Sequence, residues 1–382
     1  MRRVLHALVV VSVVAVPALA QGLGDAQMQK ANKAASTVVK ERMAKERPDD
    51  AKVLQAVEAA DIVVVRGQYD RVEDVLRNLD IKHTVVSPHQ VASLTLNAKQ
   101  LLVVDCPGNI PKAGIEKIRK FVNAGGYLYT TDWALTNVVQ QAFPGYIKFN
   151  GRETGNDVVE VEVKQTEHNL LKHLTLSREN PKWWLEASSY PIKVLDKEKV
   201  DVLITSKEMS RKYGEAPIAV HFRYGDGQVL HMASHFVLQQ GQARTVAEKK
   251  KAKDYIAADS DLKPETKEAL KGKVEFSDEV VAGDLGSAYS AQQVTSNIVI
   301  ERKKDQSRID GLYSKSLKAP VPAKPKAMPT TPGAQPAPAS PQATPTAELP
   351  AGTKVKELER QGDQVKVRTM EGEEAWVPAS AL

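Results

Sequence analysis

Short apolar runs alternate with amphipathic stretches between residues 61 and 135, and this alternation limits the possible folds more than any other feature of the chain. The runs at 61–65, 83–86, 101–104 and 127–131 have the length and composition of strands that are buried on both faces. The stretches between them repeat apolar residues three and four positions apart, which is typical of helices that cover a sheet. Strands that alternate with helices form a mainly parallel sheet with right-handed crossovers. The sequence therefore predicts an α/β body whose sheet is flanked by helices.

Capping signals predict where two of these helices begin. Asp70 is followed three residues later by Glu73, and Ser87 by Gln90, so each pair is a candidate capping box. Pro88 also fits the first helical position, which proline favours. We therefore expect helices to start at Asp70 and at Ser87.

The ends of the predicted strands carry polar and reactive side chains. Arg66 follows the first strand. Asp105 and Cys106 follow the third, and Asp132 and Trp133 follow the fourth. In open parallel sheets the ligand crevice lies beyond the carboxyl ends of the strands. The sequence therefore predicts that these side chains line one ligand pocket.

Residues 1–20 have the three parts of a secretory signal peptide. Arg2 and Arg3 supply positive charge, an apolar stretch follows, and Ala-Leu-Ala at 18–20 fits a cleavage site. The stretch is too short for a typical membrane-spanning helix, and an uncleaved N-terminal anchor is the alternative. We expect an exported protein, periplasmic or extracellular, with no transmembrane segment in the mature chain.

Charge and cysteine content exclude two classes of protein. The 382 residues carry a formal net charge of +6, which falls by two when Arg2 and Arg3 are removed. So small a surplus on a chain of this length gives no case for nucleic-acid binding. The single cysteine excludes a disulfide framework within the chain.

Composition divides the mature chain into four parts. Residues 21–57 are rich in helix formers and are expected to form an N-terminal helix. Residues 58–316 form the α/β body, in which 241–284 are a charged insertion with one short helix. Residues 317–348 are a disordered linker rich in Pro and Ala, because they lack the apolar periodicity that a packed core needs. Residues 349–382 form a separate small module.

Four segments of the body resemble class I glutamine-amidotransferase-like domains, and most closely the trehalose-utilisation-type branch. They are LLVVDCPGNIPKAGIEKIRKFVNAGGYLYTTD at 101–132, EHNLLKHL at 167–174, KWWLEASSY at 182–190 and GDGQVLHMASHF at 225–236. The resemblance covers about residues 58–240 and implies a flavodoxin-like sheet. It also implies that the last segment is a strand ending in a pocket histidine, His235, and that an acidic residue and a tyrosine of KWWLEASSY approach the pocket.

Departures from this family argue against glutamine hydrolysis. The glutamine-hydrolysing members carry a nucleophilic cysteine after the Gly-Gly strand, where this sequence has Asp132 and Trp133. The only thiol, Cys106, follows the preceding strand, and no glutamate stands two residues after His235. The covalent mechanism needs both a nucleophile and a carboxylate that orients the histidine. Glutaminase activity is therefore not expected.

Residues 349–382 resemble a bacterial SH3-like barrel. Short alternating runs are separated by turn residues at Gly362-Asp363 and Glu371-Gly372, and the sequence closes on GEEAWVP. Members of this family are commonly extracytoplasmic and often associate with cell wall or peptides. The alternative is a small folded cap without a ligand.

Three candidate sites each allow two interpretations. Asp132 and His235 can act together in acid–base chemistry or as two ligands of a metal ion, but no third ligand with suitable spacing is found. No metal and no other cofactor is therefore predicted. Cys106 is either a buried structural thiol or a reactive one near a helix N-terminus. His231, four residues before His235 on the same strand, is expected to be a hydrogen-bonded structural side chain.

An aromatic cluster is the third candidate site. Trp183, Trp184 and Tyr190 lie close together in a chain with only 5% aromatic residues. They either pack in the core or stack against a sugar or peptide ring.

These observations predict a non-catalytic binding or scaffolding protein of the cell envelope. The expected partner is a cell-wall or saccharide ligand, or an envelope protein bound through the C-terminal module. The alternative is a hydrolase that acts on saccharides or peptides through Asp132 and His235, with Cys106 as a further candidate. The predicted ligand pocket consists of Arg66, Asp105, Cys106, Asp132, Trp133, Trp184, Tyr190 and His235.

Overall fold

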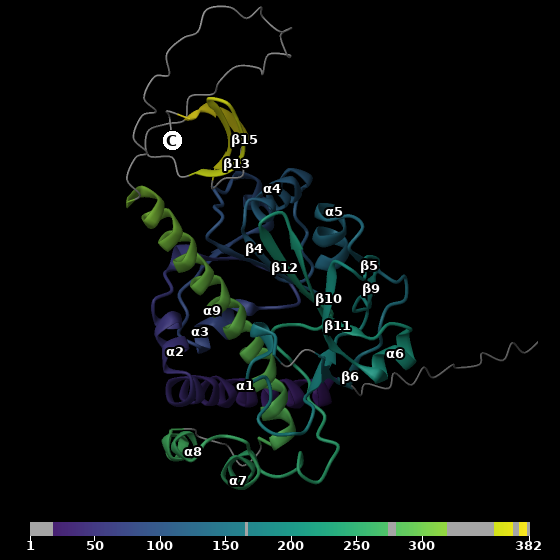
Figure 1. Ribbon diagram of the computed structural model, residues 1–382. Helices are drawn as coiled ribbons and strands as arrows, with labels where there is room; N and C mark the ends of the chain where they lie inside the picture. Colours follow the sequence, from purple (N-terminus) through teal and green to yellow (C-terminus); the bar gives the residue numbers. More distant parts are fainter. Residues whose placement is uncertain (1–17, 165–166, 274–279, 319–354, 370–373, 380–382) are drawn as a thin grey trace, which may run out of the picture.

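An eight-stranded sheet forms the centre of the body (Figure 1). The computed structural model describes residues 18–164, 167–273, 280–318, 355–369 and 374–379. Most of the expected signal peptide and nearly all of the expected linker lie outside these residues. The strand order is β2–β1–β3–β4–β12–β11–β10–β7.

One half of the sheet is parallel. Its strands are β1 (Ile62–Val65), β2 (Thr84–Val86), β3 (Leu101–Val104), β4 (Tyr127–Thr131) and β12 (Gly227–Met232). The four strands predicted from the apolar runs are confirmed, because each begins within one residue of its expected start. The order 2-1-3-4-5 of these strands is that of flavodoxin-like sheets. β1, β3 and β4 are buried along their whole length, as their continuous apolar runs require.

The other half of the sheet is antiparallel. β11 (Pro217–Tyr224) forms a hairpin with β12 and pairs on its other side with β10 (Val200–Thr205), which pairs with β7 (Glu162–Val163). Two further ribbons consist of β5 (Ile147–Phe149) with β9 (Ile192–Val194), and β6 (Asp157–Glu160) with β8 (Lys182–Leu185). The connection from β8 to β9 passes the carboxyl ends of the parallel strands and supplies part of the candidate site.

Helices cover both faces of the sheet. On one side α3 (Val72–Asn78) packs against α1 (Ala18–Glu46) and α9 (Ala282–Lys318), and α2 (Pro48–Gln55) also contacts α9. On the opposite side α4 (Lys112–Asn123) packs against the 3₁₀ helix η2 (Pro88–Ser93) and α5 (Gln140–Ala142). The remaining helical elements are η1 (Ala59–Asp61), the π-helical η3 (Leu135–Val139), η4 (Asn169–Leu171), α6 (Lys207–Tyr213), α7 (Ala252–Ala258) and α8 (Pro264–Leu270). In the part of the chain that the structure describes, none of these helices combines the length and hydrophobicity needed to cross a lipid bilayer.

Helices α1 and α9 cross each other on the same side of the sheet as α3 (Figure 1). The Ser36 hydroxyl of α1 donates to the Gln292 side chain of α9 at 2.7 Å, and the Gln292 amide donates to the Asn32 carbonyl at 2.8 Å. These buried polar groups satisfy one another, so the two helices can pack closely despite their polar contact residues.

Two local predictions differ from the structure. The Ser87–Gln90 capping box is present, but Asp70 does not cap α3, whose N-cap is Arg71. The insertion holds two helices, α7 and α8, where one was expected.

A small antiparallel sheet forms the C-terminal part. It consists of β13 (Val355–Gln361), β14 (Gln364–Thr369) and β15 (Glu374–Pro378), around a core of Val365, Val367 and Val377. This arrangement fits a separate small β domain, as expected.

Candidate functional site

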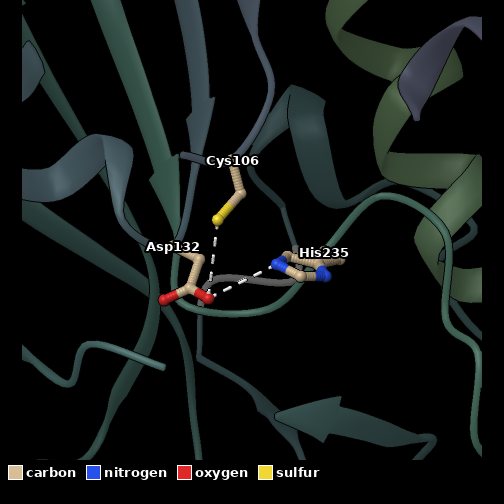
Figure 2. Close-up of side chains that lie close together, drawn as sticks. All are labelled: Cys106, Asp132 and His235. Atoms are coloured by element: carbon tan, nitrogen blue, oxygen red, sulfur yellow. Dashed lines mark hydrogen bonds and ion pairs between the residues drawn. The ribbon is translucent and has the colours of Figure 1, made fainter. Parts of the chain in front are cut away.

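Three adjacent strand ends bring Cys106, Asp132 and His235 together (Figure 2). Cys106 lies two residues after β3, Asp132 directly follows β4, and His235 lies three residues after β12. Because these strands are parallel neighbours, their carboxyl ends meet at one edge of the sheet. The Asp132 Oδ2 atom lies 3.3 Å from His235 Nε2 and 3.9 Å from Cys106 Sγ. All three side chains are at most 2% exposed.

Asp132 occupies a sharp strand-to-helix turn. Its φ angle is +45°, in the left-handed region that non-glycine residues rarely adopt. Its carboxylate accepts the Tyr190 backbone N–H at 2.8 Å and the Ser189 hydroxyl at 3.0 Å. Such local strain persists only where the surroundings fix the conformation. The turn therefore anchors the 186–190 segment to the end of β4.

His235 is enclosed by acidic and aromatic side chains. Its Nδ1 atom lies 3.5 Å from the Glu186 carboxylate, and its ring meets the Trp184 ring edge-on at 5.7 Å. Within the described ranges, neither ring nitrogen makes a hydrogen bond of acceptable geometry, although Asp132 and Glu186 are both near. A buried imidazole without hydrogen bonds is costly and calls for a physical explanation.

A second group of buried acids lies behind the histidine. Asp70 is 1% exposed, and its carboxylate accepts the backbone N–H groups of Phe236 and Val237 at 2.8 and 3.2 Å, next to His235. Asp105 and Glu73 are also buried, and one oxygen of each has no hydrogen-bond partner among the residues that the structure describes. The site thus gathers more acidic than basic groups in a region that is shielded from solvent.

Burial and the neighbouring acids shift the pKa of several groups in the site. Burial alone would lower the pKa of His235, but the nearby charge of Asp70 and the contact with Asp132 raise it well above its usual value. Burial, reinforced by Asp132, raises the pKa of the Cys106 thiol to about 11. Burial and the charge of Asp70 raise the pKa of Asp105 well above normal.

The pKa values of two further acids, Asp70 and Glu186, are raised as well. Burial raises the pKa of Asp70, although His235 and the backbone N–H donors act against the shift. Burial also raises the pKa of Glu186, against the opposing influence of His235.

An aromatic strip covers the outer side of this site. It consists of Tyr69, Trp133, Phe149 and Tyr190, of which Tyr69 is 41% exposed and the others are partly buried. Trp133 meets the Tyr69 ring edge-on at 5.4 Å and stacks on Tyr190 at 5.7 Å, and Tyr190 in turn stacks on Phe149 at 4.1 Å. The Trp133 indole N–H donates to the Ser188 carbonyl at 2.7 Å, which fixes the ring.

Several predicted pocket residues lie elsewhere than expected. Trp184 is only 4% exposed and donates its indole N–H to Asn156 at 2.6 Å, so it is a core residue that contacts His235 and cannot stack on a ligand. Trp183 is fully buried, and its indole N–H donates a hydrogen bond to the Ser290 hydroxyl, which agrees with the core interpretation. Arg66 points outward toward Glu73 at 3.6 Å, with a side chain that is 64% exposed.

The histidine expected to be structural lies apart from the site. His231 is buried, and its Nδ1 atom lies 2.8 Å from the Thr130 hydroxyl. Burial lowers its pKa to about 3. His231 is therefore neutral and packed within the sheet.

The family resemblance indicated one important side chain, and the sequence spacing misjudged another. Glu186 takes the place of the carboxylate that is absent after His235, and only the resemblance of KWWLEASSY pointed to an acidic residue there. Cys106 follows a different strand from the family nucleophile, yet the parallel sheet places its sulfur beside Asp132 and His235. Cys106 could therefore serve as the third metal ligand that the sequence spacing did not indicate.

The largest pocket among those found lies away from these residues. It has a volume of about 480 Å³ and is lined by charged side chains that include Asp157, Glu208, Lys212 and Arg244. Lys212 pairs with Asp157 at 2.8 Å, and Arg244 pairs with Glu208. Arg211 also lines the pocket, so three basic and two acidic side chains leave it with one formal positive charge.

Comparison with known proteins adds nothing on activity. No protein-family model and no curated protein matches the chain. Among solved structures, the chain is similar to a protein from Thermoplasma acidophilum described as a GMP synthase subunit, with 13% identity and a TM-score of 0.39 over 67% of this chain and 98% of that one.

Two further structures are similar at the same level. A ThuA-like protein from Bacteroides uniformis has 13% identity and a TM-score of 0.34 over 47% of this chain and 81% of that one. The GH42 β-galactosidase Gan42B of G. stearothermophilus has 14% identity and a TM-score of 0.32 over 46% of this chain. The chain spans only 27% of the length of that enzyme. Likenesses of this extent carry no argument about function.

Proposed function

We propose that this chain is an exported binding protein of the cell envelope that holds a saccharide ligand of the cell wall on the aromatic strip. The strip is the observation that carries the proposal. Tyr190 is stacked between Trp133 and Phe149, so Tyr69 and Trp133 are the rings that we propose contact the sugar. Their rigidity lowers the entropy lost on binding.

Polar groups beside the strip suit a hydroxylated ligand. Asn137 lies one helical turn after Trp133, and its backbone N–H donates to the Trp133 carbonyl. The Glu186 side chain is 32% exposed. The Asn137 amide N–H groups already donate to the Pro107 carbonyl and to Asn109, so its side-chain carbonyl oxygen and the Glu186 carboxylate are the acceptors that sugar hydroxyl groups can use.

The buried site supports binding rather than turnover. Cys106, Asp132 and His235 are each at most 2% exposed, so in this conformation none of them reaches a ligand on the strip. A general base or nucleophile must come within hydrogen-bond reach of the substrate. In this proposal the buried residues hold the strand-to-helix turn at Asp132 and the 186–190 segment in place, and these in turn position the aromatic strip.

The C-terminal sheet completes the proposal as a docking module. We take β13–β15 to be part of an SH3-like module on the C-terminal side of the Pro-rich tether. Such a layout lets the body bind one component of the envelope while the module binds another.

The test is co-sedimentation of the purified chain with peptidoglycan, followed by titration with soluble peptidoglycan fragments. Trp133→Ala is expected to weaken binding by about tenfold, the amount that one lost stacking contact of roughly 1.4 kcal/mol produces. The matched control is Tyr224→Ala, which removes a partly exposed ring at the opposite edge of the sheet. Equal binding by the Trp133 variant and the wild type would refute the proposed surface.

A hydrolase acting through Asp132 and His235 is the second candidate. It is favoured by the 3.3 Å approach of Asp132 Oδ2 to His235 Nε2 and by the strained turn that presents Asp132. Both carboxylate oxygens of Asp132 already accept hydrogen bonds, which weighs against it. The assay measures soluble product released from peptidoglycan. If the wild type releases product and Asp132→Asn does not, hydrolysis and not binding is the function.

A further inference from the structure

Three potential metal ligands converge inside the protein. One ligand atom from each of Cys106, Asp132 and His235 can be chosen so that all three lie within 4.8 Å of one another. Figure 2 shows that the thiol and the imidazole both point toward the Asp132 carboxylate. Each residue follows a central strand of the sheet, and sites on such rigid elements hold their geometry well.

The unpaired histidine is a second, independent sign of a ligand. His235 is 1% exposed, and neither of its ring nitrogens makes a hydrogen bond among the described residues. A cation bound between Nε2, the carboxylate and the thiol would satisfy the nitrogen that faces them. Nδ1 would then face Glu186 at 3.5 Å, as in the carboxylate–histidine–metal arrangement common in metal sites.

The other contacts of the site fit an outer coordination shell. Asp132 Oδ2 accepts the Ser189 hydroxyl and Oδ1 accepts the Tyr190 N–H, so the carboxylate is already oriented. The neighbouring acids Asp70 and Asp105 are buried as well. A divalent cation would offset this concentration of negative charge in a region of low dielectric.

We propose that Cys106, Asp132 and His235 bind one Zn²⁺ ion. Zinc accepts thiolate, imidazole and carboxylate ligands together, whereas magnesium and calcium prefer oxygen ligands alone. In a tetrahedral site with Zn–N and Zn–O bonds of about 2.1 Å, two such ligand atoms lie ~3.4 Å apart. The observed separation of Asp132 Oδ2 and His235 Nε2 is 3.3 Å.

The remaining geometry is close to that of a loaded site. The sulfur lies 3.9 Å from Asp132 Oδ2, and a zinc site with an S ligand at about 2.3 Å requires ~3.6 Å. A small rotation of the Cys106 side chain closes this difference. Zn²⁺ replaces the thiol proton on binding, and a water molecule takes the fourth position.

The test uses the purified, metal-free chain and the metals Zn²⁺ and Co²⁺ alone. One equivalent of Co²⁺ is expected to give thiolate-to-cobalt charge-transfer absorption and the intense visible bands of tetrahedral cobalt. The assignment is unambiguous because the chain has a single cysteine. Zn²⁺ is expected to displace the cobalt and to raise the melting temperature by about 5 °C at a hundredfold excess over its Kd.

Variants distinguish this site from surface histidines. Cys106→Ser is expected to abolish the charge-transfer band, and Asp132→Asn to weaken metal binding by at least tenfold. His89→Asn, which changes an exposed imidazole on η2, is the matched control and is expected to bind as the wild type does. Folding of each variant is checked by circular dichroism.

Two results would overturn the proposal. One is a folded wild-type chain that shows no thiolate band with Co²⁺. The other is Cys106→Ser and Asp132→Asn variants that bind Zn²⁺ as tightly as the wild type. Neither result bears on saccharide binding, which is measured separately.

Discussion

The Asp132 carboxylate accepts the backbone N–H of Tyr190 at 2.8 Å and so joins the turn after β4 to the aromatic strip. The same carboxylate lies 3.3 Å from His235. One buried side chain thus links the inner acidic site to the outer surface. A change at Asp132 is therefore expected to affect both the stability of the fold and the position of the rings.

Asp132→Asn is expected to lower the free energy of unfolding by about 2–4 kcal/mol. The amide keeps the shape of the carboxylate, but it places N–H donors next to groups that also donate and removes the charge opposite His235. Urea unfolding of the metal-free chain measures the change. Asp49→Asn is the control, because the Asp49 side chain is 90% exposed and its loss should cost no more than ~0.5 kcal/mol.

The sheet could be predicted because its signals are local. A run such as Ile-Val-Val-Val at 62–65 needs helices on both of its faces, wherever the rest of the chain goes. The convergence of Cys106 and Asp132 then follows from the parallel topology alone. The sequence could not show that Cys106 completes a set of three ligands, because that depends on the side-chain directions at three separate turns.

Long-range contacts explain the remaining differences. Asp70 has the local pattern of an N-cap, but its carboxylate is used by backbone N–H groups 166 and 167 residues away, and such tertiary contacts override local preference. Glu186 reaches His235 from an irregular segment whose path no periodicity predicts. Trp184 lies just before that segment, but its ring packs inward on His235.

Asp284→Asn is expected to stabilise the protein above neutral pH. Burial raises the pKa of Asp284 to about 6, and the hydrogen bond from the Gln27 amide at 2.8 Å only partly opposes this shift. An unfolded aspartate titrates near pH ~3.9, so the native state binds the extra proton between these values. In the wild type, the stabilisation that protonated Asp284 contributes is complete below the unfolded pKa and is lost as the pH rises through about 6. The asparagine variant does not undergo this loss.

This effect is measured as the pH dependence of the difference in unfolding free energy between Asp284→Asn and the wild type. Relative to the wild type, the free energy of unfolding of Asp284→Asn should increase by about 2–3 kcal/mol between pH 4 and pH 8. Asp80→Asn, at a position whose side chain is 77% exposed, should show no comparable slope. A constant difference across this pH range would mean that Asp284 titrates normally in the folded protein.

Lys182 and Glu248 form a buried ion pair, with side chains that are 4% and 6% exposed. Lys182→Ala leaves the Glu248 carboxylate without its cation, which is expected to cost about 3–5 kcal/mol in unfolding free energy. Lys52→Ala breaks the exposed pair with Asp49 and should cost less than ~0.5 kcal/mol. If the double variant Lys182→Ala, Glu248→Ala is no more stable than Lys182→Ala, the unpaired charge is not the cause.

Removal of residues 349–382 is expected to separate docking from folding. The C-terminal sheet has its own small core of Val365, Val367 and Val377, so without it the urea midpoint of the body should change only slightly. One contact that would be lost is the donation of Arg368 to the Asn123 carbonyl at 3.0 Å and to Asp226 at 3.2 Å, a surface interaction worth ~1 kcal/mol or less.

The same truncation tests docking. If the module docks on the cell wall while the strip binds a saccharide, the truncated chain should keep its affinity for soluble peptidoglycan fragments. It should sediment less with intact peptidoglycan, because avidity is lost. Unchanged sedimentation would show that the aromatic strip alone accounts for attachment, and the Trp133→Ala variant would then remove it in either chain.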